Sequence, residues 1–236
     1  EATRQITLET GKPLAQSGRE WSLAVDQFRW YAEEARRIYG RIVESRAPGG
    51  RLEVSHEPVG VVAAFTAWNF PAALIARKVA PALAAGCAVI VRPSVEVPGV
   101  AMILFDCLRE AGIPAGVANL LVGPIATTYK PIMAAAAVRK VSLTGSTRVG
   151  QQMIRDSAET VKRVSMELGG NAPMIVFDDA DLDRALDLAV PTKYANAGQV
   201  CVTPDRFYVH EALHDRFVEG FAVRARALKL GHGLDE

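Results

Sequence analysis

Apolar residues in the first part of the chain recur at a helical period and then in short strand-like runs. Residues 21–39 place their apolar side chains at roughly helical spacing, which predicts a helix. Residues 41–44 and 51–56 are two short β-like runs. The intervening Ala47-Pro48-Gly49-Gly50 is typical of a turn, so these two runs are predicted to form a hairpin.

From residue 59 onward, apolar runs typical of strands alternate with longer runs typical of helices. The predicted strands are residues 59–65, 88–92, 119–122 and 140–144. The predicted helices are residues 72–85, 97–111, 130–137 and 149–157. Continuous apolar strands such as Val89-Ile90-Val91 suit a parallel sheet buried on both faces. The alternation therefore predicts a doubly wound α/β domain with a parallel sheet.

A second round of alternation follows this domain. Residues 174–177 and 206–210 are predicted strands, and residues 182–194 and 212–229 are predicted helices. This pattern indicates the start of a second α/β unit. The chain opens at Glu1-Ala2-Thr3 without an initiator Met and stops without a closing element, so we expect a piece cut at both ends.

Composition narrows the classes of function. The formal net charge is +1 with both signs interspersed, which argues against a nucleic-acid or anionic-membrane partner. The apolar stretch 72–91 is interrupted by Arg77, Lys78 and Pro81, so no segment is predicted to span a membrane. Three cysteines cannot form an even disulfide framework and match no metal-binding spacing. We therefore expect a reducing, cytoplasmic location and no metal.

Polar turns follow several of the predicted strands, where doubly wound sheets bind ligands. They are Thr66–Pro71, Arg92-Pro93-Ser94 and Thr144-Gly145-Ser146. Gly145 and Ser146 precede a helix, so their free N–H groups could face a phosphate, although a simple helix cap is the alternative. Gln151 stands where a P-loop needs Lys, and no G-x-G-x-x-G follows a strand. The residues alone predict anion sites without identifying a cofactor.

The run His210-Glu211-Ala212-Leu213-His214 matches the H-E-x-x-H pattern of zinc proteases. Both histidines of that pattern must lie on one helix, with a third ligand farther along. Here a β-like run leads directly into His210, and no third ligand follows at the expected spacing. We therefore expect two surface histidines at the start of a helix.

Five motifs occur in the order and approximate spacing of the aldehyde dehydrogenase superfamily, which the whole chain resembles. They are Trp68-Asn69-Phe70-Pro71, Pro81-Ala82-Leu83-Ala84-Ala85-Gly86, Thr144-Gly145-Ser146, Glu167-Leu168-Gly169-Gly170-Asn171 and Gly198-Gln199-Val200-Cys201. The resemblance implies a cofactor-binding domain over residues 1–168, with an oligomerisation hairpin at 41–57. Residues 169–236 would be the truncated N-terminal part of a catalytic domain. It also implies a small aldehyde substrate and a homo-oligomer, a dimer or tetramer.

The resemblance identifies Cys201 as the catalytic nucleophile, since a thiolate can make an aldehyde carbon tetrahedral and later leave. Polar neighbours such as Asn196, Gln199 and Thr203 argue against its burial. Cys87, in a core strand, and Cys107, on the apolar face of a helix, fit the ordinary buried cysteine.

The remaining catalytic roles also follow from the resemblance. The side chain of Asn69 and the backbone N–H of Cys201 would stabilise the oxyanion. Glu167, 34 residues before Cys201, would be the general base that releases a free acid by hydrolysis of a thioester. Its position between Met166 and Leu168, ahead of two glycines, suggests a sheltered turn that removes it partly from water.

The implied cofactor is NAD or NADP. The predicted contacts are Trp68, Asn69, Arg92, Pro93, Ser94, Val95, Gly145, Ser146 and Leu168, with Gly145 and Ser146 at the pyrophosphate and Leu168 by the nicotinamide. Val95 replaces the glutamate that family members place on the adenosine ribose. Arg92 and Ser94 could then accept a 2′-phosphate, while the adjacent Glu96 keeps the choice open.

Residues 72–78 resemble the succinate-semialdehyde dehydrogenase branch, in which the equivalent of Arg77 binds the substrate carboxylate. A second family arginine is Ala195 here, so half of that clamp is missing, and a methyl group cannot replace a guanidinium. The resemblance therefore implies a semialdehyde, another ω-carboxylated aldehyde or an aliphatic aldehyde as the substrate. The alternative is a catalytically incomplete nucleotide-binding fragment.

Overall fold

A computed structural model describes residues 1–235 and contains one five-stranded parallel sheet as its centre. The strand order is β5-β4-β3-β6-β7. The strands are β3 (Val61–Phe65), β4 (Val89–Arg92), β5 (Ala118–Leu120), β6 (Val138–Thr144) and β7 (Arg163–Glu167). The chain builds outward from β3 to β5 on one side and from β6 to β7 on the other. This is the doubly wound sheet predicted from the alternation.

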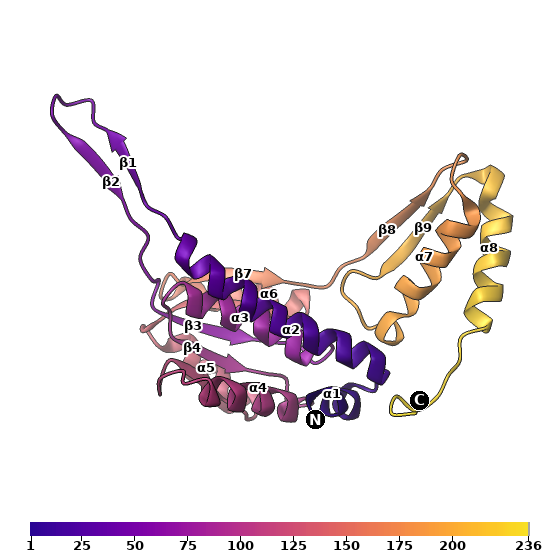
Figure 1. Cartoon of the computed structure of the whole chain (residues 1–236), viewed down its shortest axis with the longest axis horizontal. Helices are drawn as coiled ribbons and strands as arrows, with labels where there is room; N and C mark the ends of the chain where they lie inside the picture. Colours follow the sequence, from indigo (N-terminus) through magenta and orange to yellow (C-terminus); the bar gives the residue numbers. More distant parts are fainter. Residues whose placement is uncertain (236) are drawn as a thin grey trace.

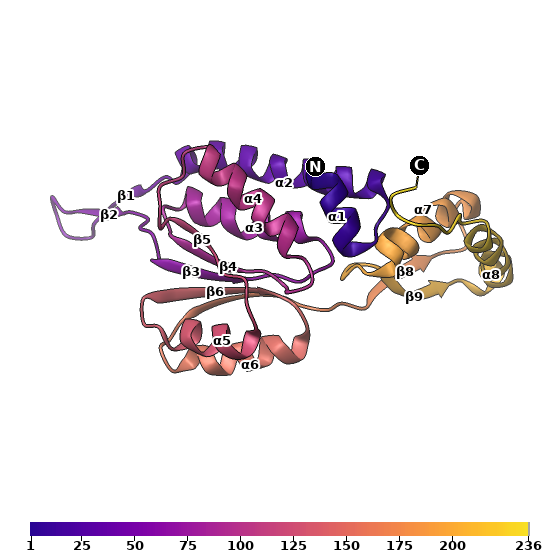
Figure 2. The ribbon, with the colours of Figure 1, turned by 90° about the horizontal axis from the view of Figure 1, so that it is seen from below.

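Helices cover both faces of this sheet (Figure 2). One face carries α1 (Ala2–Thr10), α2 (Leu14–Glu34), α3 (Pro71–Ala84) and α4 (Pro98–Glu110). The other face carries α5 (Ile125–Ala134) and α6 (Thr147–Ala158). Pro71 and Pro98 stand in the first turns of α3 and α4, where the missing N–H costs no hydrogen bond.

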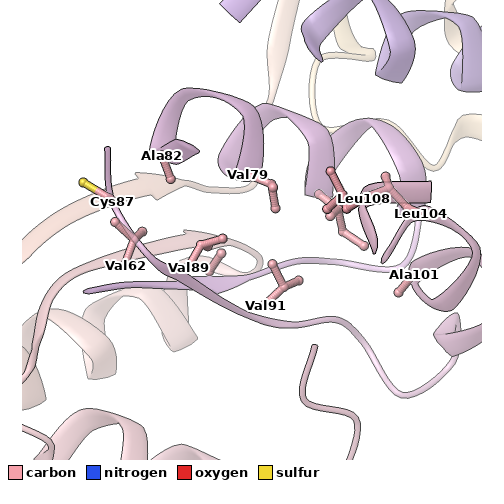
Figure 3. Packing of buried hydrophobic residues seen from close by; sticks show 11 residues of the cluster. Val62, Val79, Ala82, Cys87, Val89, Val91, Ala101, Leu104 and Leu108 are labelled. Carbon is pink, nitrogen blue, oxygen red and sulfur yellow. The ribbon is translucent and has the colours of Figure 1, made fainter. Parts of the chain in front are cut away.

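The core lies between the sheet and these two helix layers. Figure 3 shows Val62, Val89 and Val91 of the sheet facing Val79 of α3 and Leu104 of α4. A second cluster packs the opposite face against α5 and α6. Burial on both faces explains why these strands are apolar at successive positions rather than at alternate ones.

The predicted hairpin is present and projects from the body of the molecule (Figure 1). It pairs β1 (Arg41–Glu44) with β2 (Arg51–Val54) in antiparallel register. All of its strand residues are exposed, including the apolar Ile42, Val43, Leu52 and Val54.

A smaller β-α-β unit lies at the other end of the molecule (Figure 1). It comprises β8 (Ala172–Val176), α7 (Leu182–Tyr194), η2 (Ala195–Gly198), β9 (Pro204–Val209) and α8 (Glu211–Arg226). β8 and β9 pair in parallel, and the unit has its own apolar cluster. The chain then returns to the first helices, where Leu14 N donates to Gly233 O over 3.0 Å. The domain division at residue 168 stays a prediction, and residue 236 of the expected second unit lies outside the described residues.

Several elements differ from the sequence predictions, including the helix predicted at residues 130–137, which runs from Ile125 to Ala134, and the short η2, which was not predicted. Helix α1 was not predicted, and α2 begins at Leu14 rather than near residue 21, because their buried faces include the polar side chains of Thr7, Ser17 and Glu20. The short η1 (Ala35–Arg37) ends this helical region. Strand β7 was also not predicted. None of the described helices is long and apolar enough to cross a membrane.

Candidate active site

A cavity of about 800 Å³ opens beside the carboxyl ends of β3, β6 and β7. β3 and β6 are neighbours, and from them the strand order runs outward in opposite directions. At such a switch point the turn after β3 and the turn after β6 lead to opposite faces of the sheet, which leaves a crevice between them. Eight predicted site residues line this cavity: Trp68, Asn69, Arg77, Gly145, Ser146, Glu167, Leu168 and Cys201. The other four, Arg92, Pro93, Ser94 and Val95, follow β4 and are not among its lining residues.

Cys201 lies on an exposed loop that a strained turn carries into the cavity. Asn196, Ala197 and Gly198 have φ values of 49°, 55° and 80°, a left-handed region that glycine adopts easily, asparagine tolerates and alanine adopts only at a steric cost. Asn196 is held there because its N–H donates to Gln16 Oε1 over 2.9 Å. The expected exposure of Cys201 is confirmed. Its neighbours Asn196 and Thr203, which were expected to be exposed with it, are themselves buried.

Asn69 connects the turn after β3 to the cysteine loop. Its side-chain Nδ2 donates to the carbonyl oxygen of Gln199 over 2.9 Å. Its own carbonyl oxygen accepts hydrogen bonds from Asn196 Nδ2 at 3.0 Å and from Lys12 Nζ at 2.7 Å. Two segments more than a hundred residues apart are thus joined directly, next to the candidate nucleophile.

Glu167 is the last residue of β7 and is exposed. The prediction that Glu167 lies in a sheltered turn is wrong. Glu167 lies at the end of an edge strand, where the described residues leave its side chain exposed to water. Its carbonyl accepts from Gly145 N over 3.0 Å, which ties it to the turn after β6.

Gly170 brings the turn after β7 against the cysteine loop. A Cβ at this glycine would lie 2.5 Å from the carbonyl oxygen of Cys201. The neighbouring Gly169 has nothing within 4 Å of such a Cβ. Only glycine allows the backbone approach at position 170.

Lys78 is a site residue that the sequence analysis did not identify. It is buried, and Nζ donates to Ser142 Oγ over 2.9 Å. Burial lowers the pKa of Lys78 to about 8, while the negative charge of Glu167 acts in the opposite direction. Lys78 lines a second cavity of about 650 Å³ that also reaches Glu167 and Cys201. A lysine in the apolar run of α3 was the available signal.

In the part of the chain that the structure describes, the N–H groups in the first turn of α6 are not bonded to a carboxylate, unlike those of α3 and α4. Glu20 accepts hydrogen bonds from Ala72 N and Ala73 N at the start of α3, and Glu9 accepts from Gly99 N and Val100 N at the start of α4. No carboxylate from residues 1–235 bonds to the start of α6. There Ser146 is the N-cap and accepts from Val149 N over 3.4 Å, which is the alternative cap reading of this turn.

The arginine predicted at the adenosine ribose has one buried nitrogen without a partner. Arg92 Nη2 donates to Gly123 O over 3.0 Å, while Nε has no hydrogen-bond partner among the described residues. Ser94 donates to the carboxylate of Glu96, which lowers the pKa of Glu96. Val95 is exposed. A groove of about 360 Å³ next to α5 and α6, lined by Ile125, Tyr129 and Val149 among others, was not anticipated from the sequence.

The two histidines of the H-E-x-x-H run lie on the surface. His210 follows β9 and is the N-cap of α8, where its Nδ1 accepts from Ala212 N over 3.3 Å. His214 lies within α8 and is also exposed. His210 is therefore outside the helix on which a zinc protease would need it.

Comparisons with known proteins all point to one family. The whole chain, residues 1–236, matches the Aldehyde dehydrogenase family. It is 46% identical over 236 residues to the glutarate-semialdehyde dehydrogenase of Pseudomonas putida, covering 100% of this chain and 49% of that protein. It is 46% identical over 235 residues to the succinate-semialdehyde dehydrogenase (NADP(+)) of Escherichia coli, covering 100% of this chain and 49% of that protein.

A further relative is named for a different aldehyde, and a solved structure confirms the fold. A 3-sulfolactaldehyde dehydrogenase of Pseudomonas putida is 48% identical over 235 residues, which are 100% of this chain and 48% of that protein. A crystal structure of an E. coli NADP-dependent enzyme superimposes with a TM-score of 0.97 at 46% identity, covering 99% of this chain and 49% of that one. The chain thus spans about half the length of the curated relatives it matches.

Proposed function

Since the chain belongs to the aldehyde dehydrogenase family, we propose that it supplies the nucleophile and the cofactor site of an enzyme that oxidises an aldehyde to a carboxylic acid with NAD or NADP. One observation carries the proposal. Exposed Cys201 shares a single cavity with Asn69 and Glu167, although the three residues come from separate segments of the chain. In the same proposal residues 1–168 form the cofactor-binding domain and residues 169–236 the start of the catalytic domain.

In the first step the Cys201 thiolate attacks the aldehyde carbon. A C–S bond forms, and the π-electron pair of the carbonyl moves onto its oxygen. The amide of Asn69 has two N–H groups, and Gln199 O takes one of them, so the other is available to the oxyanion together with the backbone N–H of Cys201. The bond to Gln199 fixes the plane of the amide before substrate arrives.

NAD or NADP would supply the hydride acceptor when bound, and the oxidised carbon would remain on Cys201 as a thioester. The residues present fit such a dinucleotide. The first turn of α6 can meet its pyrophosphate, since no described carboxylate occupies that helix end, and a helix N-terminus favours an anion. The groove beside Ile125, Tyr129 and Val149 can take an apolar ring. The unpartnered Nε of Arg92 suits a polar group at the end of β4.

In the second step Glu167 accepts a proton from water, and the hydroxide attacks the thioester carbon. The C–S bond then breaks, which releases the carboxylic acid and restores the Cys201 thiolate. The exposed position of Glu167 in residues 1–235 leaves a water molecule direct access to its carboxylate.

The proposed substrate is a short aldehyde with an anionic group at its other end, that is, a semialdehyde. Arg77 supports this, because it is exposed and lines the cavity that contains Cys201. Relatives named for glutarate semialdehyde, succinate semialdehyde and 3-sulfolactaldehyde share an aldehyde and an acidic group. A single arginine with Ala195 in place of a second one suits an anion whose length and shape are less strictly selected.

We also propose that the whole protein is a homo-oligomer, a dimer or tetramer, in which a second copy covers the hairpin β1–β2. The exposed apolar side chains of Ile42, Val43 and Leu52 support this, because an isolated two-stranded hairpin is only marginally stable in water. Replacing Ile42 and Leu52 by Asp should shift the oligomer toward monomer in light scattering. An unchanged mass would contradict the assignment.

The deciding experiment follows NAD(P)H formation by the whole protein with succinate, glutarate and longer semialdehydes, together with uncharged aldehydes of the same length. Wild type should turn over, Cys201→Ala should not, and Arg77→Met should lose the preference for charged over uncharged aldehydes. Activity that survives Cys201→Ala would refute the mechanism. Nucleotide binding by calorimetry without turnover would instead favour the alternative, a cofactor-binding module that is catalytically incomplete.

A further inference from the structure

A buried ion pair lies behind the turn that presents Asn69. Lys12, between α1 and α2, and Glu20, on α2, are only 2% and 4% exposed. Lys12 Nζ and Glu20 Oε2 are 2.5 Å apart. Neither residue lines the candidate active-site cavity, and the sequence pattern identified neither of them.

The two side chains hold the two ends of this turn. Lys12 Nζ donates to the carbonyl oxygen of Asn69 over 2.7 Å and lies 4.0 Å from the centre of the Phe70 ring. Glu20 Oε1 accepts from Ala72 N over 2.8 Å and from Ala73 N over 3.3 Å, at the start of α3. The Lys12 ammonium group thus directs its contacts to Glu20, to the carbonyl of Asn69 and to the Phe70 ring.

Helix capping alone does not explain the lysine. Glu9 caps α4 in the same way, through Gly99 N at 2.6 Å and Val100 N at 3.0 Å, and forms no ion pair within residues 1–235. Removing two charges from water is costly, and burial indeed lowers the pKa of Lys12 against the attraction of Glu20. What Lys12 adds to the capping is its bond to Asn69.

We propose that Lys12 and Glu20 are positioning residues that orient the Asn69 amide toward the oxyanion. This inference rests on the proposed function. Lys12 fixes the carbonyl end of the turn and Glu20 fixes the N–H groups that follow it, so the peptide plane of Asn69 cannot rotate. Gln199 O then holds the side-chain amide from the other side. The rate of attack by Cys201 therefore depends on an ion pair that does not touch the substrate.

The test uses the whole protein and a variant that removes the pair without leaving one buried charge alone, Lys12→Met/Glu20→Gln. It is compared with Asn69→Ala and with the combination of all three changes. The rate of the first NAD(P)H turnover is measured at saturating cofactor. Folding is checked by circular dichroism and denaturant unfolding.

Lys12→Met/Glu20→Gln should slow the first turnover by about 10- to 100-fold, because a misplacement of about 1 Å has that effect on an oriented group. Asn69→Ala should slow it by about 100- to 1000-fold. Adding the pair variant to Asn69→Ala should produce no further loss, because the pair acts through Asn69.

Two matched controls separate positioning from general destabilisation. Lys162→Met removes another buried lysine that donates to backbone carbonyls, those of Ala135 and Val138, at 2.7 and 2.8 Å. Glu9→Gln removes the charge of the cap on α4. Both should lower the free energy of unfolding and leave the rate of the first turnover within about two-fold of wild type.

Losses that multiply when the pair variant is added to Asn69→Ala would overturn the inference, as would equal losses in the controls. If the pair variant does not fold, Lys12→Arg takes its place on both backgrounds. Lys12→Arg keeps the positive charge and moves the hydrogen-bond donor. A loss of first-turnover rate on the wild-type background that is absent on the Asn69→Ala background supports positioning. An equal loss of rate on both backgrounds overturns it. Failure of the proposed function looks different, since wild type would then show no turnover that depends on Cys201.

Discussion

A single methyl group added at Gly170 should disable the proposed nucleophile, Cys201, while leaving the sheet intact. The Cβ of Gly170→Ala would lie 2.5 Å from the carbonyl oxygen of Cys201, whereas ordinary contact begins near 3.4 Å. The two backbones must therefore separate by about 0.9 Å. Neither side can yield cheaply, because the cysteine loop is held by Asn69 and the strained turn at Asn196.

A displacement of about 1 Å at a reacting group corresponds to roughly a 100-fold loss of rate, or about 2.7 kcal/mol of activation free energy. The loss in free energy of unfolding from overpacking should be about 1–3 kcal/mol. The assay is kcat for a semialdehyde at saturating cofactor, with denaturant unfolding of the same protein. Gly169→Ala is the matched control, because its Cβ meets nothing within 4 Å. Equal kcat values in the two alanine variants would refute the reasoning.

Three further predictions follow from burial and charge. Burial lowers the pKa of Lys78 to about 8, so the folded state binds fewer protons than the unfolded state between pH 8 and 10.5, and stability rises with pH there. The stability of Lys78→Met relative to wild type should thus fall by roughly 3 kcal/mol across that window in denaturant titrations, and a flat difference would contradict the shift. Glu9→Gln should lower the free energy of unfolding by about 1 kcal/mol, and no loss would show that the cap is unimportant. A thiol reagent should modify the exposed Cys107 and Cys201 in the native protein and reach buried Cys87 only after unfolding, as mass spectrometry of the labelled peptides can check.

Cys107 shows how a local pattern can mislead. It was expected to be buried on the apolar face of its helix, and it is exposed. Helix α1 covers the start of α4, where Glu9 bonds to Gly99 and Val100, and Cys107 lies two turns farther along. The period of apolar residues identifies a face of a helix, but it does not say how far the covering element extends.

Strand β7 and the buried charged residues near the site also could not be predicted from local pattern. Arg163–Glu167 becomes a strand because β6 offers it an edge, with Lys140 opposite Arg163 and Thr144 opposite Glu167. Lys12, Glu20 and Lys78 are charged residues that propensity places at the surface, yet tertiary contacts bury all three.

The sequence by itself determined the alternation of strands and helices, the hairpin and the motifs around Asn69, Glu167 and Cys201. These features are local, since each depends on the period of apolar residues or on a few consecutive side chains. Only the tertiary structure decided that these three residues share one cavity, that Glu167 is exposed, and that Lys12 and Glu20 support the Asn69 turn. Desolvation and hydrogen bonding depend on which distant segments meet, and neither period nor spacing records that.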